Sequence, residues 1–160
     1  MPGILKAVGG GNAYDCEKLE KELIKDAKFP YLDMIGIDCY AESFNDDFMI
    51  ERAKHLIDNE ARAYVHYILS YRLTDKLSIE EILKQAKKLV ERIDKFKGHQ
   101  VAIIYHSSTN SISHHCHIVV NAVNSETGRK LSVSKFDLAR AKKILISLDK
   151  EKGLGAEWKI

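Results

Sequence analysis

The chain has 160 residues, and 45% of them are hydrophobic. This length is enough for one packed domain and is too short for two domains of ordinary size. Charged residues make up 30%, but the net charge is only +2, so composition alone does not indicate a nucleic-acid-binding protein. No apolar run approaches the roughly 20 residues that span a bilayer, and three unevenly spaced cysteines fit reduced thiols. We therefore expect one cytoplasmic domain over residues 1–160, without a membrane segment.

The first half of the chain predicts strands that alternate with helices. In chain order we expect a strand over residues 3–8, a flexible glycine turn over 9–12, a helix over 16–29, a strand or extended segment over 31–40, a helix over 46–59 and a central strand over 61–73. Asp15 is the expected N-cap of the first helix, and Pro30 prevents its continuation. In the central strand, alternation places Tyr64, His66 and Ile68 on one face.

The second half predicts two capped helices and a β-hairpin between them. Ser78 with Glu81, and Ser134 with Asp137, have the spacing of a capping box, so a helix should begin at each serine. In chain order we expect a helix over 78–96, strands over 99–106 and 115–123 joined by a loop over 107–113, a turn over 124–130, a short strand over 130–134 and a helix over 134–153. This order indicates an α+β fold with a central antiparallel sheet and flanking helices.

Four of the seven histidines lie between residues 105 and 121. His115 and His117 share one face of their predicted strand, about 7 Å apart, and Cys116 points to the other face. His106 ends the preceding strand, so the hairpin can bring its ring to the same point. Three neutral imidazoles leave open positions on a divalent ion, which favours a catalytic metal site over a closed structural one. His114, at the loop edge, is a spare.

The alternative is a run of surface histidines in a mobile loop. A single histidine on a strand is usually packed or solvated, and this interpretation applies to His55, His66 and His99 taken one by one. The cluster is harder to explain in this way, because several buried imidazoles would each need partners for their ring nitrogens. A metal site is the preferred interpretation.

These residues carry a family resemblance. The segment GHQVAIIYH (98–106), followed by HHCHIVVNAVNSETGRKL (114–131), resembles the three-histidine motif of plasmid mobilisation relaxases, which are HUH-type single-strand endonucleases. That motif has a histidine at the end of one strand, H-x-H on the next, hydrophobic residues, asparagine and commonly NxxTGxK. The resemblance implies about five antiparallel strands with flanking helices, a divalent metal held by His106, His115 and His117, and nicking of one DNA strand at a transfer origin.

The resemblance also implies a reaction and its partners. In such enzymes a tyrosine attacks a phosphodiester and becomes joined to the 5′ end, while the metal polarises the scissile phosphate. Mg²⁺ or Mn²⁺ is the expected cofactor, with Zn²⁺, Ni²⁺ and Co²⁺ as alternatives. The expected partners are single-stranded DNA at the transfer origin and accessory relaxosome and coupling proteins. Relaxases commonly continue into further domains, so the chain is expected to be the N-terminal part of a longer protein.

The sequence departs from the family pattern at the nucleophile. The family usually carries its tyrosine in a Y-I/L pair late in the first helix, where this chain has Leu23 and Ile24. Tyr14 and Tyr31 are the first candidates, and Tyr40, a histidine or a metal-bound water are further ones. A protein that binds DNA without cleaving it is also an alternative.

A second departure concerns acidic residues around the metal. Relatives often have an aspartate in the loop after the first histidine, whereas residues 107–110 of this chain are SSTN. Asn121 shares the histidine face and could orient a ligand through its amide oxygen. His66, on a neighbouring strand, is the candidate outer-shell group or proton acceptor. The length of the loop leaves the choice between His114 and His115 open.

Basic residues near the C-terminal helix could follow a phosphate backbone. We assign this role to Arg129, Lys130, Lys135 and Arg140, and the alternative is a solvated helix face. Three functions remain in competition. They are a relaxase-type endonuclease and strand transferase, a relaxase-like module that binds DNA without turnover, and a metal-dependent phosphodiesterase that uses bound water.

Overall fold

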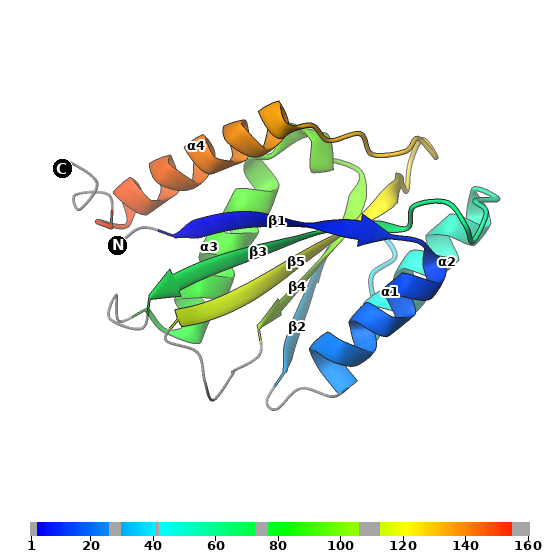
Figure 1. Ribbon diagram of the computed structural model, residues 1–160, viewed down its shortest axis with the longest axis horizontal. Helices are drawn as coiled ribbons and strands as arrows, with labels where there is room; N and C mark the ends of the chain where they lie inside the picture. The colour runs from blue at the N-terminus through cyan, green and yellow to red at the C-terminus, as the bar shows by residue number, and fades with distance from the viewer. Residues whose placement is uncertain (1–2, 26–29, 41, 73–76, 106–112, 155–160) are drawn as a thin grey trace.

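The computed structural model describes residues 3–25, 30–40, 42–72, 77–105 and 113–154, except the side chains of residues 113 and 114. Five antiparallel strands form one sheet in the order β1-β3-β5-β4-β2 (Figure 1). The strands are β1 (Ile4–Gly11), β2 (Tyr31–Ile35), β3 (Tyr64–Arg72), β4 (His99–Tyr105) and β5 (Ser113–Asn124). The predicted α+β fold with a central antiparallel sheet is therefore confirmed.

Helices cover both faces of this sheet (Figure 1). On one face α1 (Ala13–Glu20) continues into the π-helical turn η1 (Lys21–Lys25) and packs beside α2 (Phe44–Lys54). On the other face lie α3 (Ile79–Arg92), the short 3₁₀ turn η3 (Asp94–Phe96) and α4 (Lys135–Glu151). Both predicted capping boxes are present, with Ser78 and Ser134 as the N-caps. None of the helices in the described ranges is both long and apolar enough to pass through a lipid bilayer.

Alternate residues of the strands belong to two separate hydrophobic cores. In β5, Ile118 and Val120 pack in the core of α3 and α4, whereas Val119 packs in the core of α1, η1 and α2. His117 lies two residues before Val119 and therefore on the same face. His66 of β3 pairs with Val119, so it shares this face too. We call this side of the sheet the histidine face.

Four local predictions in the chain were wrong. The helix predicted over 46–59 is α2, which ends at Lys54, so residues 55–59 are not helical. Residues 9–11 end strand β1 instead of forming a turn, because Gly9 (φ 122°) opens a β-bulge and a side chain on Gly10 would overlap the carbonyl oxygen of Tyr64. The N-cap of α1 is Asn12, and Asp15 is the third helical residue, which completes a capping box. Residues 130–134 form no strand beyond a single bridge between Val123 and Lys130.

A buried carboxylate ties the N-terminus to the rest of the fold. Asp149 of α4 is fully buried and accepts hydrogen bonds from the Gly3 amide (2.9 Å), the Tyr71 hydroxyl (2.7 Å) and the Gln85 amide (3.3 Å). These donors come from the N-terminal segment, β3 and α3. A single side chain therefore links four parts of the chain that are distant in sequence.

Candidate metal centre on the histidine face

Strand β5, the middle strand of the sheet, carries His114, His115 and His117. His117 lies between Ile104 of β4 and Ile68 of β3, and His115 lies beside Ser70 of β3. The described pairing of β4 with β5 ends at Tyr105, opposite Cys116. His106 follows Tyr105 in sequence and lies outside the described residues, as does the side chain of His114. Convergence of three rings therefore stays a prediction.

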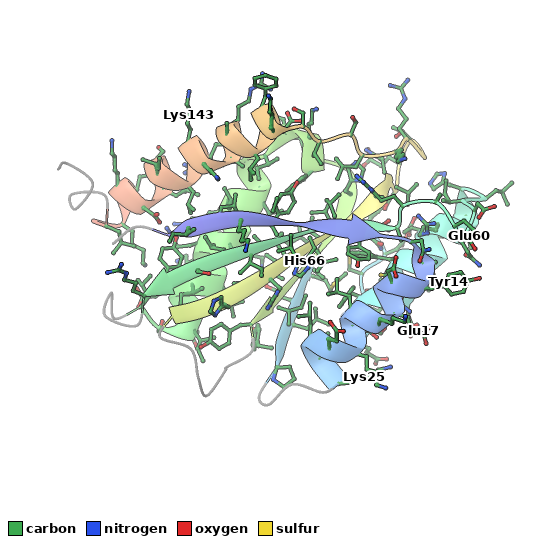
Figure 2. All side chains as sticks on the ribbon, in the orientation of Figure 1. Tyr14, Glu17, Lys25, Glu60, His66 and Lys143 are labelled. Carbon is green, nitrogen blue, oxygen red and sulfur yellow. The ribbon has the colours of Figure 1, made fainter. Side chains whose placement is uncertain are left out.

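His66 and His117 are direct partners. The Nε2 atom of His66 lies 2.9 Å from the Nδ1 atom of His117, and the ring centroids are 5.1 Å apart. Both residues are only 8% exposed. Burial lowers the pKa of His66 to about 4, so its ring is neutral at physiological pH. Figure 2 labels His66 at the centre of the sheet.

This contact fixes how the ring of His117 can be used. A neutral imidazole has one N–H donor and one acceptor nitrogen. When Nδ1 of His117 donates to His66, the lone pair of His117 Nε2 is available to a metal ion. The opposite tautomer would place a proton on Nε2 and block coordination there. His66 is thus suited to orient His117 as a ligand.

The donor chemistry of this face fits a divalent ion with nitrogen ligands. Strands β1, β3, β4 and β5 contain no acidic residue. Cys116 lies in the core of α3 and α4, where burial raises the pKa of its thiol, so it faces away as predicted. In the described part of the chain, no group of three or more histidine, cysteine or acidic side chains is arranged to hold a metal. A site with three imidazole ligands would take at least one of them from the rest of the chain, which includes His106.

The side chain of Asn121 bonds to neighbouring parts of the sheet, and its backbone carbonyl oxygen accepts a hydrogen bond from His99. Asn121 is fully buried, and its side-chain oxygen accepts the Val123 amide at 3.1 Å. Its side-chain nitrogen donates to Gln100 Oε1 at 3.0 Å and lies 3.5 Å from the carbonyl oxygen of Phe48. These contacts place Asn121 on the histidine face, and the Val123 amide uses one of the two lone pairs of the amide oxygen that we expected to orient a ligand.

The structure does not bring the candidate tyrosines to the imidazoles. Tyr14 is the second residue of α1, is 57% exposed and points away from the sheet, at the end of the helix opposite Lys25 (Figure 2). Tyr31 opens β2 and pairs with Tyr105, whose side chain packs with α3 and α4. The register therefore directs Tyr31 away from the histidine face. Tyr40, in the loop after β2, is 68% exposed.

Tyr64 is the one tyrosine of the described strands on the histidine face. It is 8% exposed and belongs to the core of α1 and α2. Burial, reinforced by Cys16 and two nearby carboxylates, raises the pKa of Tyr64 to about 12. A phenol that ionises so reluctantly is a poor nucleophile, so strand packing explains this residue better than catalysis does.

The predicted DNA-contacting residues lie away from the histidines. Arg129 and Lys130 follow the far end of β5, which is about 30 Å along the strand from His115. Lys135 and Arg140 are on α4, which packs on the opposite face of the sheet. Arg140 lies 3.6 Å from the carboxylate of Asp137. These four residues therefore form no continuous surface with the imidazoles.

Comparisons with known proteins agree with this architecture. The family model "Relaxase: MobA/VirD2-like, nuclease domain" matches residues 16–154. A solved structure described as "Molecular Basis of Vancomycin Resistance Transfer in Staphylococcus aureus" superposes with a TM-score of 0.66 over 98% of this chain and 96% of that chain, at 8% identity. At this identity the likeness shows a shared fold. No curated protein matches the sequence significantly. Because the family model covers most of the chain, the chain belongs to the MobA/VirD2-like relaxases, the DNA-nicking nucleases of mobilisation.

Proposed function

We propose that this chain nicks one strand of DNA at a transfer origin in a metal-dependent reaction that serves conjugative mobilisation. The observation that carries the proposal is the His66–His117 pair at 2.9 Å, on a sheet face whose strands β1, β3, β4 and β5 lack carboxylates. His106, His115 and His117 would hold the ion, with His114 as a neighbouring imidazole. A bound divalent ion offsets the negative charge that builds up on the scissile phosphate.

The donor atoms bear on which ion the site would hold. Imidazole nitrogens suit Zn²⁺ and Ni²⁺, whereas Mg²⁺ and Mn²⁺ prefer oxygen donors. Neutral imidazoles leave the full charge of the ion available to a phosphate. We therefore propose that the site holds a divalent ion, to be identified by assays with Mg²⁺, Mn²⁺, Zn²⁺ and Ni²⁺. His66 is the residue proposed to orient His117. Asn121 would act only by keeping β5 in register.

The nucleophile is proposed to be a tyrosine, with Tyr31 placed before Tyr14. Attack by the phenolic oxygen on phosphorus forms a 5′-phosphotyrosine bond and breaks the bond to the 3′ oxygen, which leaves with a proton. Tyr31 pairs with Tyr105, beside the β4–β5 hairpin that carries the histidines, whereas Tyr14 lies at the far end of α1. The side chain of Tyr31 would have to move around the edge of β2 to reach the histidine face.

A second candidate function is hydrolysis by water, without a covalent adduct. The observation that favours it is that neither Tyr14 nor Tyr31 shares the histidine face. The protein would then release both cleaved ends. Both candidates require the same imidazoles, so they differ only in the species that attacks phosphorus.

One assay separates these functions. The protein is incubated with each divalent metal and with labelled single-stranded oligonucleotides tiled across the DNA that flanks its gene. A covalent protein–DNA band supports the tyrosine reaction, free cleaved strands support water, and retarded intact DNA supports a binding module. Tyr31→Phe is expected to abolish the adduct and Tyr14→Phe to retain it. Adduct formation by both single variants would overturn the assignment of Tyr31.

A further inference from the structure

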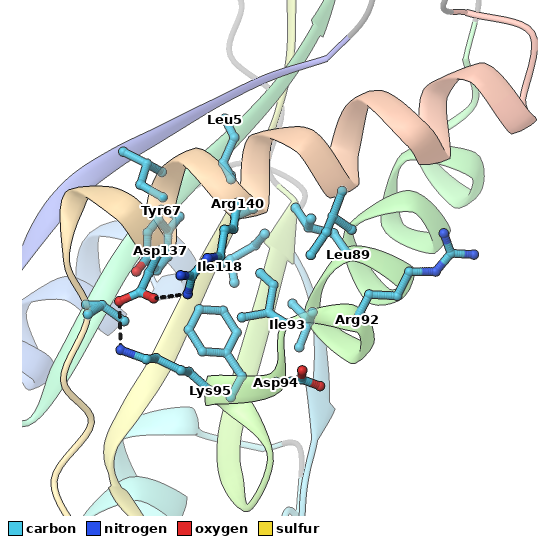
Figure 3. Close-up of a pocket in the computed structure, with 16 residues that line it drawn as sticks. Leu5, Tyr67, Leu89, Arg92, Ile93, Asp94, Lys95, Ile118, Asp137 and Arg140 are labelled. Carbon is cyan, nitrogen blue, oxygen red and sulfur yellow. Dashed lines mark hydrogen bonds and ion pairs between the residues drawn. The ribbon is translucent and has the colours of Figure 1, made fainter.

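A cavity lies on the face of the sheet opposite the histidines, between helices α3 and α4 (Figure 3). Its volume is about 140 Å³. Leu5 of β1, Tyr67 of β3 and Ile118 of β5 form its floor, and apolar side chains such as Leu89 of α3 and Ala141 of α4 form its walls. Protein interiors are close-packed and contain few voids larger than a water molecule, so a space of this size is unusual.

Some apolar side chains around the cavity are incompletely buried. Ile93, Leu138 and Ile144 line it and are only partly buried, whereas Leu89, which also lines it, is 0% exposed. Atoms that face a void lose van der Waals contacts, so an apolar occupant would stabilise this core. Apolar cavities of about 150 Å³ stay dry and accept benzene, whereas pockets for drug-sized ligands measure about 300–1,000 Å³. The cavity therefore fits a single six-membered ring.

One polar group at the cavity has no partner. Tyr67 is 8% exposed and lines the cavity, and within the described ranges its hydroxyl makes no hydrogen bond. Its ring is held against Phe96, with the centroids 5.9 Å apart. By contrast, Tyr71, on the same face of β3, donates to Asp149 at 2.7 Å. Because buried hydroxyl groups usually have a partner, the Tyr67 hydroxyl is suited to bind a polar group of a ligand.

Two cations at the rim of the cavity already have a carboxylate partner. Lys95 Nζ donates to Asp137 at 2.8 Å, and Arg140 lies 3.6 Å from the same carboxylate (Figure 3). A charged group carried into the apolar cavity would lose its hydration without gaining a free counter-ion. Burial, reinforced by the charge of Asp137, raises the pKa of Tyr67, so its hydroxyl stays protonated and can both donate and accept a hydrogen bond. These features favour an uncharged ligand.

We propose that this cavity binds a small uncharged ring compound with one hydroxyl group, of the phenol class. The ring would fill the space above Leu5 and Ile118, and the ligand hydroxyl would bond to the hydroxyl of Tyr67. Tyr67 and Ile118 are paired in register, and the residues that precede them in sequence, His66 and His117, make their contact on the other face. The site needs neither metal nor DNA, so it does not depend on the proposed function.

The test is isothermal titration calorimetry in EDTA with three probes of similar ring size, which are phenol, toluene and benzoate. Wild type should bind phenol, and it should bind benzoate at least about tenfold more weakly. Tyr67→Phe should weaken phenol binding about fivefold, the effect of one hydrogen bond, and keep toluene binding within about twofold. Ala141→Leu, which fills the cavity, should weaken both phenol and toluene at least about tenfold. If circular dichroism shows that this variant does not fold, Leu138→Phe takes its place.

The matched control is Tyr64→Phe, which removes a phenolic hydroxyl from the core on the opposite face. It should bind phenol as wild type does. Absence of phenol binding by the wild type, wild-type phenol affinity in Tyr67→Phe, an equal loss of toluene in that variant, or tighter binding of benzoate than of phenol would overturn the inference. Failure of the proposed function is read separately, from the metal and adduct assays with the histidine variants.

Discussion

The Nε2 atom of His66 lies 2.9 Å from Nδ1 of His117, and this contact joins two central strands on the face that carries the candidate ligands. A histidine therefore occupies the position from which an outer-shell group can set the tautomer of a ligand. Unlike a carboxylate, a neutral imidazole adds no negative charge beside the ion.

Replacement of His66 should weaken metal binding. His66→Phe removes the acceptor for His117 Nδ1, so divalent metal affinity is expected to fall 10–100-fold, as is typical for outer-shell partners of ligands. His66→Gln should recover part of the loss, because its amide oxygen can accept the same hydrogen bond. Isothermal titration calorimetry measures both. Tyr67→Phe, on the other face of β3, is the control. Wild-type affinity in His66→Phe would show that the contact does not orient a ligand.

The buried carboxylate of Asp149 should be a major stabilising group. Asp149→Ala leaves the Gly3 amide, the Tyr71 hydroxyl and the Gln85 amide without their acceptor. The free energy of unfolding should fall by about 3 kcal/mol or more, and Tyr71→Phe alone should cost about 1–2 kcal/mol. Urea unfolding of the three proteins tests this. A loss below about 1 kcal/mol in Asp149→Ala would mean that water or other donors replace the network.

Gly10→Ala should lower the free energy of unfolding by disturbing strand β1, without changing the histidine side chains. Its new methyl group would overlap the carbonyl oxygen of Tyr64, which is backbone and cannot rotate away. A loss of about 1–3 kcal/mol is expected from urea unfolding. Val8→Ala, at a position that is 49% exposed in the same strand, should stay within about 0.5 kcal/mol of wild type. Equal effects of the two substitutions would refute the close approach of β1 to β3.

Acidification should destabilise the protein through its two buried histidines with a lowered pKa, which are His66 and, as the contribution measured here, His99. This ring is 6% exposed and donates from Nδ1 to the Asn121 carbonyl oxygen at 2.7 Å. Burial lowers the pKa of His99, although hydrogen bonds to the backbone of Asn121 and Val123 oppose the shift. In the unfolded chain the pKa of a histidine is about 6.5, so below that pH the unfolded state binds more protons than the folded state does.

The sign of the effect follows from this difference. Stability carried by neutral His99 is complete above about pH 6.5 and is lost as the pH falls toward the lower, folded pKa. Urea midpoints measured in EDTA should therefore be lower at pH 5.5 than at pH 7.5. His99→Gln should make this decline smaller. An equally steep decline in that variant would assign the effect to other groups.

The sequence predicted most of the framework because its signals were local. The capping boxes at Ser78 and Ser134 need only a serine and an acidic residue three positions apart. The faces of β3 and β5 follow from alternation, which places Val119 in one core and Ile118 in the other. These predictions hold without any knowledge of which strands are neighbours.

The remaining features depend on strand order and register. The glycines at 9–11 read as a turn, and only the packing of β1 against Tyr64 shows why a strand needs them. The sequence placed His66 on a neighbouring strand, but its direct contact with His117 depends on the β3–β5 register. The row in which Lys6 of β1, Ile68 of β3 and His117 of β5 are neighbours was not predicted, because no motif marks positions on strands that pair only in the fold.

Imidazoles on the histidine face are proposed to hold a divalent ion. The most direct measurement is the stoichiometry and affinity of Mn²⁺, Ni²⁺ and Zn²⁺ for the purified wild type and for His106→Ala, His115→Ala and His117→Ala, each checked for folding by circular dichroism. We expect one ion per chain in the wild type and its loss in all three variants. The ion should be retained in Cys116→Ala, because that thiol lies in the opposite core. Absence of a bound ion in the wild type, or full retention in His117→Ala, would contradict this proposal.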